Sequence, residues 1–255
     1  MPMSTGWPAV FWVARHGQSA GNVARDAAES AGHPVIDIAD RDVDVPLSTL
    51  GERQSDALGI WFGAMAENER PTAVFCSPYV RAHQTAQRVA AGFGLAPEFL
   101  VRDERLREKE FGILDRLTVL GIRDRHPELA EQRGHVGKFY FRPPGGESWC
   151  DVILRLRSFV EMVTREHAEG RVLVVAHQVV VNCLRYLLET LDEATILAID
   201  READVPNCGV TVYRHDPSAG ASGKLVLQEA NVVVPLAEAG ALVTAAPDAQ
   251  AAPKP

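Results

Sequence analysis

The sequence predicts an α/β fold in which a three-layer, doubly wound and mostly parallel sheet is covered by helices on both faces. The prediction rests on apolar strand patterns that alternate with amphipathic helix patterns along the chain. Residues 9–14, 73–76 and 173–176 are continuous apolar runs, which is typical of strands buried on both faces of a sheet. Polar residues follow each run and indicate a turn after the strand.

Segments with apolar residues at helical spacing cover residues 49–65, 78–91, 152–163 and 179–189. Thr49 and Glu52 have the spacing of a capping box at the start of the first segment. Ser148 or Asp151 is expected to cap the third segment. The alternating order of strands and helices favours the doubly wound arrangement.

The chain has 255 residues, which is near the upper limit for one hydrophobic core, and we expect a single domain over residues 1–235. Two segments do not fit the periodic pattern. Residues 23–43 are polar and acidic without a clear period, and residues 236–255 are rich in alanine and proline. Such compositions indicate a mobile insertion and a disordered tail.

Composition and charge restrict the partners that the protein can bind. Apolar residues make up 46% and charged residues 24%, which is ordinary for a globular protein. The formal net charge of −8 offers no basic face for nucleic acid or an anionic membrane surface. No apolar stretch of about 18 residues occurs. We therefore expect no nucleic-acid or membrane partner, but a small anionic molecule in a locally positive pocket. The sequence leaves the oligomeric state open.

The four cysteines stand singly at positions 76, 150, 183 and 208. Their spacing fits neither a disulfide framework nor a zinc site. This usage favours a reducing compartment, and no leader segment is visible. We expect a cytoplasmic protein.

A histidine lies just beyond two of the apolar runs. Arg15-His16-Gly17 follows the first run and His177 follows the last, while Arg81 lies in the first turn of the helix after the middle run. In an open parallel sheet, ligands bind beyond the carboxyl ends of the strands. These side chains are therefore expected to lie around one site.

The residue types at this site suit a phosphate monoester. A neutral imidazole such as that of His16 can attack phosphorus at neutral pH. The guanidinium groups of Arg15 and Arg81 can bind phosphate oxygens in forked pairs, and the turn at Gly17 can add backbone donors. Arg81 at a helix N-terminus opposes the helix dipole unless an anion binds there. The pattern predicts a phosphate site with His16 as the nucleophile.

Five landmarks along the chain resemble those of the histidine phosphatase superfamily, which includes the phosphoglycerate mutases. They are Arg15 to Asn22 (RHGQSAGN), Asp44 to Gln54 (DVPLSTLGERQ), Ser77 to Ala86 (SPYVRAHQTA), Leu106 to Gly112 (LREKEFG) and Val175 to His177 (VAH). Five landmarks in the family's order are far more specific than one short motif. The resemblance covers about residues 9–235 and implies a phosphoglycerate mutase-like fold.

The resemblance also implies a role for each matching residue. His16 would take the phosphoryl group, and Glu108 would donate a proton to the leaving group and later accept one from water. The residues that the resemblance implies for the phosphoryl oxygens are Arg15, Asn22, Arg81 and His177. We also expect Gly17 and Ser19, in the turn beside His16, to bind the phosphate. The family implies no metal and no other cofactor.

A narrower likeness, to the fructose-2,6-bisphosphatase domain of the bifunctional kinase/phosphatase, lies in residues 141–148 (FRPPGGES) and at His177-Gln178. It implies a sugar phosphate as substrate, with Arg142 and Gln178 in contact with it. Val119 and Gly145 stand where that domain is expected to place a tyrosine and a lysine.

The sequence thus predicts hydrolysis of a small phosphomonoester through a phosphohistidine. Two alternatives stay open: a cofactor-dependent phosphoglycerate mutase, and a module that binds phosphate without turnover. Two other phosphatase patterns are set aside. Cys208 to Arg214 has the spacing of a cysteine phosphatase loop but the apolar pattern of a strand. Asp42 to Val45 resembles an aspartate-nucleophile motif, but no buried strand precedes it.

Overall fold

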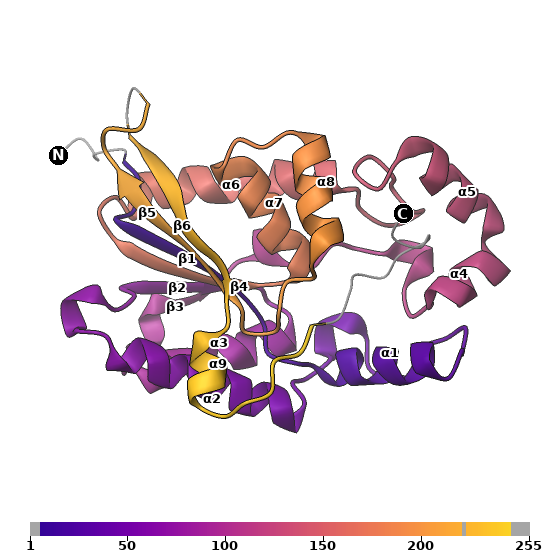
Figure 1. The fold of residues 1–255 in the computed structure, drawn as a ribbon, viewed down its shortest axis with the longest axis horizontal. Helices are drawn as coiled ribbons and strands as arrows, with labels where there is room; N and C mark the ends of the chain where they lie inside the picture. Colours follow the sequence, from indigo (N-terminus) through magenta and orange to yellow (C-terminus); the bar gives the residue numbers. More distant parts are fainter. Residues whose placement is uncertain (1–5, 221–222, 246–255) are drawn as a thin grey trace.

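The computed structural model describes residues 6–220 and 223–245. Within these residues, six strands form one sheet in the order β3-β2-β4-β1-β5-β6 (Figure 1). The strands are β1 (Val10–Arg15), β2 (Ala73–Cys76), β3 (Leu100–Arg102), β4 (Arg171–Ala176), β5 (Val210–Asp216) and β6 (Lys224–Val232). The three apolar runs of the sequence correspond to the inner strands β1, β2 and β4.

Strand direction places the two histidines at one edge of the sheet. Strands β3, β2, β4 and β1 run parallel to one another, whereas β5 and β6 are antiparallel to their neighbours. Arg15 lies opposite Ala176 in the β1–β4 pair, and the backbone N–H of His16 donates to the carbonyl oxygen of Ala176 (2.9 Å). His16 and His177 therefore leave neighbouring strands side by side, and the mostly parallel sheet is confirmed.

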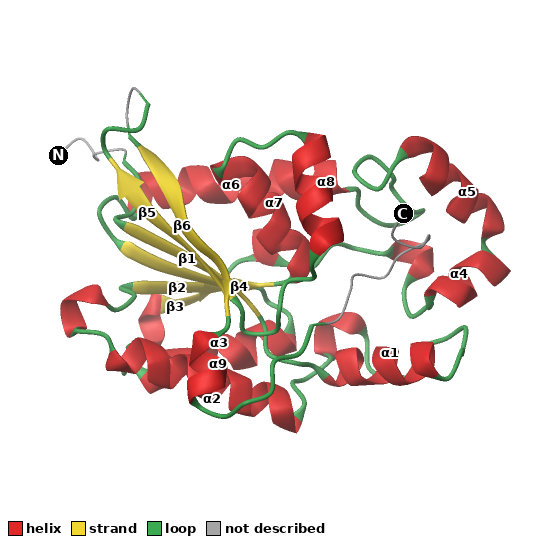
Figure 2. Ribbon diagram, viewed as in Figure 1, coloured by secondary structure: helices red, strands yellow, loops and turns green. Residues whose placement is uncertain are grey.

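Helices cover both faces of the sheet (Figure 2). One face carries α2 (Thr49–Ala64), α3 (Val80–Gly92) and α9 (Val234–Glu238), and the other carries α6 (Trp149–Glu166), α7 (Gln178–Leu188) and α8 (Glu193–Glu202). To one side, on the right in Figure 1, lie α1 (Ala20–Ser30), α4 (Val119–Arg125) and α5 (Pro127–Val136). This is the predicted three-layer α/β arrangement. None of the helices in the described part of the chain is long and apolar enough to cross a bilayer.

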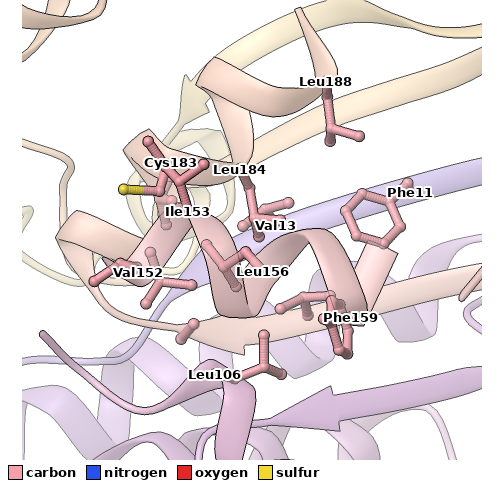
Figure 3. Close-up of a cluster of buried hydrophobic side chains, with 14 of the residues drawn as sticks. Phe11, Val13, Leu106, Val152, Ile153, Leu156, Phe159, Cys183, Leu184 and Leu188 are labelled. Carbon is pink, nitrogen blue, oxygen red and sulfur yellow. The ribbon is translucent and has the colours of Figure 1, made fainter. Parts of the chain in front are cut away.

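Strand β1 shows why the apolar runs form buried strands. Alternate side chains of a strand point to opposite faces of the sheet. Phe11 and Val13 belong to the cluster beneath α6 and α7, which Figure 3 shows, whereas Trp12 and Ala14 belong to the cluster beneath α2 and α3. Burying a large apolar side chain contributes about 1.5–3 kcal/mol, so a strand that is buried on both faces needs apolar residues throughout.

Side-chain caps fix the starts of two long helices beside the site. The hydroxyl of Ser48 accepts the N–H of Gly51 (3.1 Å) and caps α2, so the predicted capping box of Thr49 and Glu52 is wrong: Thr49 is already helical. Ser148 caps α6, and the carboxylate of Asp151 accepts the N–H of Ser148 (2.8 Å). The sequence left Ser148 and Asp151 as alternatives, and together they form one capping box.

Two segments differ from their sequence prediction. The polar segment that was expected as an insertion at 23–43 begins inside α1, which the hydroxyl of Ser19 caps by accepting the N–H of Asn22 (3.1 Å). The tail that was expected to be disordered from residue 236 is packed on α2 as far as it is described: Leu236 is buried, and Gln54 donates to the carbonyl oxygen of Leu242 (2.8 Å). Residues 246–255 lie outside the described residues.

Candidate active site

A cavity of about 90 Å³ opens at the ends of β1 and β2. Its polar lining residues are Arg15, His16, Ser19, Asn22, Arg25, Asp40, Asp42, Arg81, Glu108, Asp115 and Arg116, and its main apolar ones are Ile36, Ile38, Val45 and Phe111. The structure thus brings together six of the side chains that the sequence predicted for the site, and it places His177 directly behind His16.

His16 is buried in a single tautomer. Its Nδ1 lies 2.7 Å from the carbonyl oxygen of Gly17, which can only accept, so Nδ1 carries the proton. Its Nε2 accepts a hydrogen bond from Nε of Arg81 at 3.3 Å. Burial, and then the positive charges of Arg81 and Arg15, lower the pKa of His16 well below its usual value. His16 is therefore neutral near pH 7 and keeps a lone pair on Nε2.

His177 packs against His16, with ring centroids 5.1 Å apart and the rings inclined at 65°. Its Nε2 lies 2.8 Å from the hydroxyl of Ser77, and its Nδ1 has no hydrogen-bond partner in the described part of the chain. Burial, followed by Arg81, lowers its pKa well below the usual value. His177 is fully buried and is not among the residues that line the cavity, so its contact with a bound phosphoryl group stays a prediction.

Two of the four arginines that line the cavity, Arg15 and Arg81, are buried. Nη1 of Arg15 donates to the carbonyl oxygen of Val205 (2.6 Å), which anchors the side chain at the end of β1. Arg81 lies in the first turn of α3, as predicted, over the ring of Tyr79 at 5.0 Å from its centroid. Both side chains are buried at this edge of the sheet. A buried cation interacts with an anion far more strongly than an exposed one, because water screens it less.

Glu108 lines the same cavity and is almost fully buried. Its Oε1 accepts the backbone N–H of Lys109 (2.8 Å), and its Oε2 is 3.8 Å from Nδ1 of His177. The loop is held from α6, because Arg155 donates to the carbonyl oxygen of Glu108 (3.2 Å) and pairs with Glu147 (3.0 Å). The carboxyl group therefore has a fixed position near both histidines.

The remaining signature residues take different positions. Asn22 and Ser19 line the cavity, and the side-chain oxygen of Asn22 accepts the backbone N–H of Ser19 (3.0 Å). The amide nitrogen is therefore the group that Asn22 can offer to a ligand. The backbone N–H of Gly17, in contrast, donates to the hydroxyl of Thr85 on α3 (3.1 Å) rather than into the cavity.

Arg142 and Gln178 are not among the residues that line the cavity. Arg142 is exposed and donates Nε to the carboxylate of Asp151 (2.7 Å), and Gln178 is buried with Nε2 bound to Asp204 (3.0 Å). Each side chain is held by a nearby carboxylate. Their assignment as substrate contacts stays a prediction.

The sequence pointed to residues 23–43 and to the loop from about Arg107 to Glu147 as the segments that select the substrate, but their position in the outer wall of the cavity could not be predicted. This wall joins segment 33–42 to segment 111–118 through backbone contacts: Ile36 donates to the carbonyl oxygen of Arg116, and Thr118 donates to that of Pro34. Arg116, in a left-handed conformation with φ 60°, donates from its guanidinium to the carbonyl oxygen of Asp40 (2.7 Å). Such loop-to-loop contacts have no period, so the sequence carried no signal for them.

Cys208 does not form a nucleophile loop. It is fully buried, and its backbone N–H donates to the carbonyl oxygen of Arg15 (3.1 Å) before the chain enters β5. Burial raises the pKa of its thiol to about 12, so the thiol is protonated at neutral pH. A buried, protonated thiol is not the nucleophile of a cysteine phosphatase, which agrees with the sequence prediction for Cys208.

Comparison with known proteins identifies the class of this fold and site. The histidine phosphatase superfamily (branch 1) matches residues 11–226. The chain belongs to this superfamily, and its relatives and structural neighbours support a phosphatase.

Three similar proteins illustrate the match. A 6-phosphofructo-2-kinase/fructose-2,6-bisphosphatase from Caenorhabditis elegans is 32% identical over 224 residues, which are 84% of this chain and 43% of that protein. A phosphoglycerate mutase-like protein from Arabidopsis thaliana is 30% identical over 230 residues, covering 82% of this chain and 74% of that protein. The native structure of mycobacterial glucosyl-3-phosphoglycerate phosphatase has a TM-score of 0.68 and 25% identity, and the match covers 88% of this chain and 99% of that one. The chain thus spans less than half the length of the Caenorhabditis relative.

Proposed function

We propose that this phosphatase hydrolyses a small phosphomonoester without a metal, through a phosphoryl group carried on Nε2 of His16. One observation carries the proposal. Nδ1 of His16 is committed as a donor to Gly17 (2.7 Å), so the lone pair is on Nε2, where it accepts a long hydrogen bond from Nε of Arg81 (3.3 Å) that attack on phosphorus would replace. A neutral, positioned imidazole next to two fixed cations suits attack on a phosphate dianion.

In the first step, Nε2 of His16 forms a bond to phosphorus as the bond from phosphorus to the leaving oxygen breaks. Glu108, in its protonated form, gives its proton to that oxygen, so the alcohol leaves neutral. Arg15, Arg81 and the amide of Asn22 would stabilise the charge on the phosphoryl oxygens. The proximity of His177 to His16 (5.1 Å between centroids) supports the same role for its ring.

In the second step, water attacks phosphorus and the bond to Nε2 breaks. Glu108 now accepts the proton that water loses, which returns it to its starting form. Inorganic phosphate leaves, and His16 is again neutral with Nδ1 bound to Gly17. A single carboxyl group serves both steps, because each step moves one proton in the opposite direction.

A sugar phosphate or a related hydroxyl-rich metabolite is the substrate class that we favour. Relatives and neighbours whose names include fructose-2,6-bisphosphatase and glucosyl-3-phosphoglycerate phosphatase support this choice. The outer wall also combines charged side chains, among them Asp40 and Asp115, with the ring of Phe111. Paired polar groups beside an aromatic face suit a ligand with many hydroxyl groups.

The test is phosphate release from a panel of monoesters that includes an aryl phosphate, sugar phosphates and 3-phosphoglycerate, in the presence of a chelator. Wild-type protein should release phosphate, and His16→Ala should not. Mass spectrometry of protein quenched during turnover should find the added phosphate on the peptide that contains His16. Activity that survives in His16→Ala would refute the mechanism.

The same experiment separates the alternatives. A phosphoglycerate mutase would return isomerised phosphoglycerate with little free phosphate. A non-catalytic module would bind phosphate without labelling His16 or releasing product.

A further inference from the structure

We propose that Asp42 is a built-in competitor of the substrate: its carboxylate occupies the phosphate-binding face of Arg81 and must leave before a phosphoryl group can bind there. The proposal rests on the proposed function in one respect, namely that Arg81 binds the phosphoryl group. It goes beyond that function by assigning a regulatory contact to a residue outside the catalytic motifs.

The contact between Asp42 and Arg81 uses the donors that a phosphate would need. Oδ1 of Asp42 lies 3.0 Å from Nη1 of Arg81, and Oδ2 accepts from Nη2 at 3.2 Å. The carbonyl oxygen of Asp42 accepts from Nη1 as well (2.5 Å). Because Nε is bound to His16 (3.3 Å), every guanidinium nitrogen of Arg81 already has a partner. A forked carboxylate pair is the same arrangement by which guanidinium groups bind phosphate.

Asp42 is also on the exposed side of this pair. The side chain of Arg81 is 7% exposed, whereas that of Asp42 is 40% exposed. A substrate that enters from solvent and binds Arg81 therefore meets the carboxylate first. Two like charges a few ångströms apart near a protein surface repel each other by several times the thermal energy. The carboxylate of Asp42 therefore weakens the binding of a phosphoryl group to the same guanidinium.

The segment that carries Asp42 is built to move at low cost. Asp42 begins the short 3-10 helix η1 (Asp42–Asp44), and none of the residues of η1 is buried. Polar contacts hold the turn itself, namely those of Asp42 to Arg81 and that of the neighbouring carbonyl of Asp40 to Arg116 (2.7 Å), and buried Val45 anchors the chain directly after it. Segments with few buried apolar contacts open with little free energy. Displacement of Asp42 by a phosphoryl group is thus an exchange of one forked pair for another.

This arrangement has a consequence for the reaction cycle. While substrate is bound, Arg81 pairs with the phosphoryl group, and after hydrolysis Asp42 competes with the product phosphate for the same donors. Asp42 therefore weakens the binding of inorganic phosphate and favours its release.

The test is the affinity for inorganic phosphate of wild-type protein, Asp42→Asn and Asp44→Asn, measured by calorimetry and as the inhibition constant in the phosphatase assay. Asp44 is a matched control, since it lies in the same turn and pairs with exposed Arg41 (2.6 Å) rather than Arg81. Asp42→Asn should bind phosphate up to about fivefold more tightly, the largest factor that one exposed ion pair usually supplies. Asp44→Asn should match the wild type, and the gain in Asp42→Asn should shrink at high salt.

Asp42→Ser, which also removes the charge, should behave as Asp42→Asn does and guards against an effect of the amide itself. Unchanged or weaker phosphate binding in both Asp42 variants of an active enzyme overturns this inference and leaves the proposed function intact. Equal tightening in Asp44→Asn also overturns it, because the effect would then be one of net charge. Wild-type protein that neither binds nor releases phosphate would overturn the proposed function itself.

Discussion

The hydroxyl of Thr244 donates a hydrogen bond to the side-chain oxygen of Asn207 (2.9 Å), and this contact ties the C-terminal segment to the loop of residues 16–19 after β1. We call this loop, which carries the proposed nucleophile His16, the catalytic loop. The side-chain nitrogen of Asn207 in turn donates to the carbonyl oxygen of His16 (3.1 Å). Gln54 on α2 completes the network, because it donates to the hydroxyl of Thr244 (3.0 Å) and accepts the backbone N–H of Gln18 (2.8 Å). The backbone on both sides of Gly17 is thus held by side chains from two distant segments.

Thr244→Val should therefore weaken both stability and catalysis. The change keeps the shape of the side chain but leaves Asn207 and Gln54 each without one partner, at a cost of about 1–3 kcal/mol in the free energy of unfolding. We expect kcat to fall about tenfold with a smaller change in KM, because His16 loses part of its support. Urea unfolding and steady-state kinetics measure the two effects. Leu242→Ala is the control, since the side chain of Leu242 in the same segment is 71% exposed. Wild-type kinetics in Thr244→Val would show that the network does not position His16.

Local patterns predicted the centre of the site. The apolar runs of β1 and β4 ended at His16 and His177, and their parallel pairing brought the two rings together. Arg81 was found in the same way, from a strand and a helix start. Glu108 gave no such signal and was found only by its resemblance to a family motif, because an acidic residue in a charged loop has no distinctive period.

Contacts between distant loops could not be predicted. Asp42 reaches Arg81, and Thr244 reaches Asn207, through side-chain hydrogen bonds that leave no pattern in the sequence. The tail from residue 236 has the composition of a disordered segment, yet Gln54 holds its backbone at Leu242. Composition indicates whether a segment folds by itself. Whether it packs on the rest of the protein depends on hydrogen-bond donors in other elements, here the side chain of Gln54.

Glu108→Gln should slow the hydrolysis of an alkyl phosphate much more than that of an aryl phosphate. The glutamine keeps the size of the side chain but cannot donate a proton to the leaving oxygen. With an alkyl phosphate we expect the rate to fall about 10²- to 10⁴-fold. With an aryl phosphate, whose leaving group needs less help from an acid, the loss should be much smaller. Glu104→Gln, at an exposed position in the same loop, is the control. Equal losses on both substrates would exclude Glu108 as the acid.

Stability should fall in acid because of the two buried histidines. The pKa of His177 and that of His16 lie well below 6.5 in the folded protein, mainly through burial, whereas in the unfolded chain each is about 6.5. Below that pH the unfolded chain binds protons that the folded chain does not. The free energy of unfolding then falls with pH by up to about 1.4 kcal/mol per pH unit for each histidine, and no such loss occurs above about pH 7.

Urea unfolding at about pH 7.5 and about pH 5.5 measures this dependence. His177→Asn removes one of the two groups, so its stability should depend less on pH than that of the wild type. His135→Asn, at an exposed position on α5, should keep the wild-type dependence. An unchanged dependence in His177→Asn would contradict a neutral, buried His177.

Gly51→Ala should disrupt the catalytic loop by direct contact. A Cβ atom at Gly51 would lie 1.9 Å from the carbonyl oxygen of Gln18, and one at Gly17 would lie 2.5 Å from the carbonyl oxygen of Gly51. The loop after β1 and the start of α2 therefore pack backbone against backbone, and an added methyl group must push the loop away. We expect a loss of about 1–3 kcal/mol in the free energy of unfolding, with loss of phosphate binding as His16 moves.

Gly134→Ala is the matched control for this prediction. Gly134 lies in α5 with no atom within 4 Å of a Cβ at that position, so alanine meets no obstacle there. Alanine also favours the helix over glycine by about 0.5–1 kcal/mol, which should raise the stability and leave activity unchanged. Thermal unfolding and the phosphatase assay compare both variants with the wild type. If Gly51→Ala unfolded at the wild-type temperature with full activity, the close packing of the two backbones would not be what holds the catalytic loop in place.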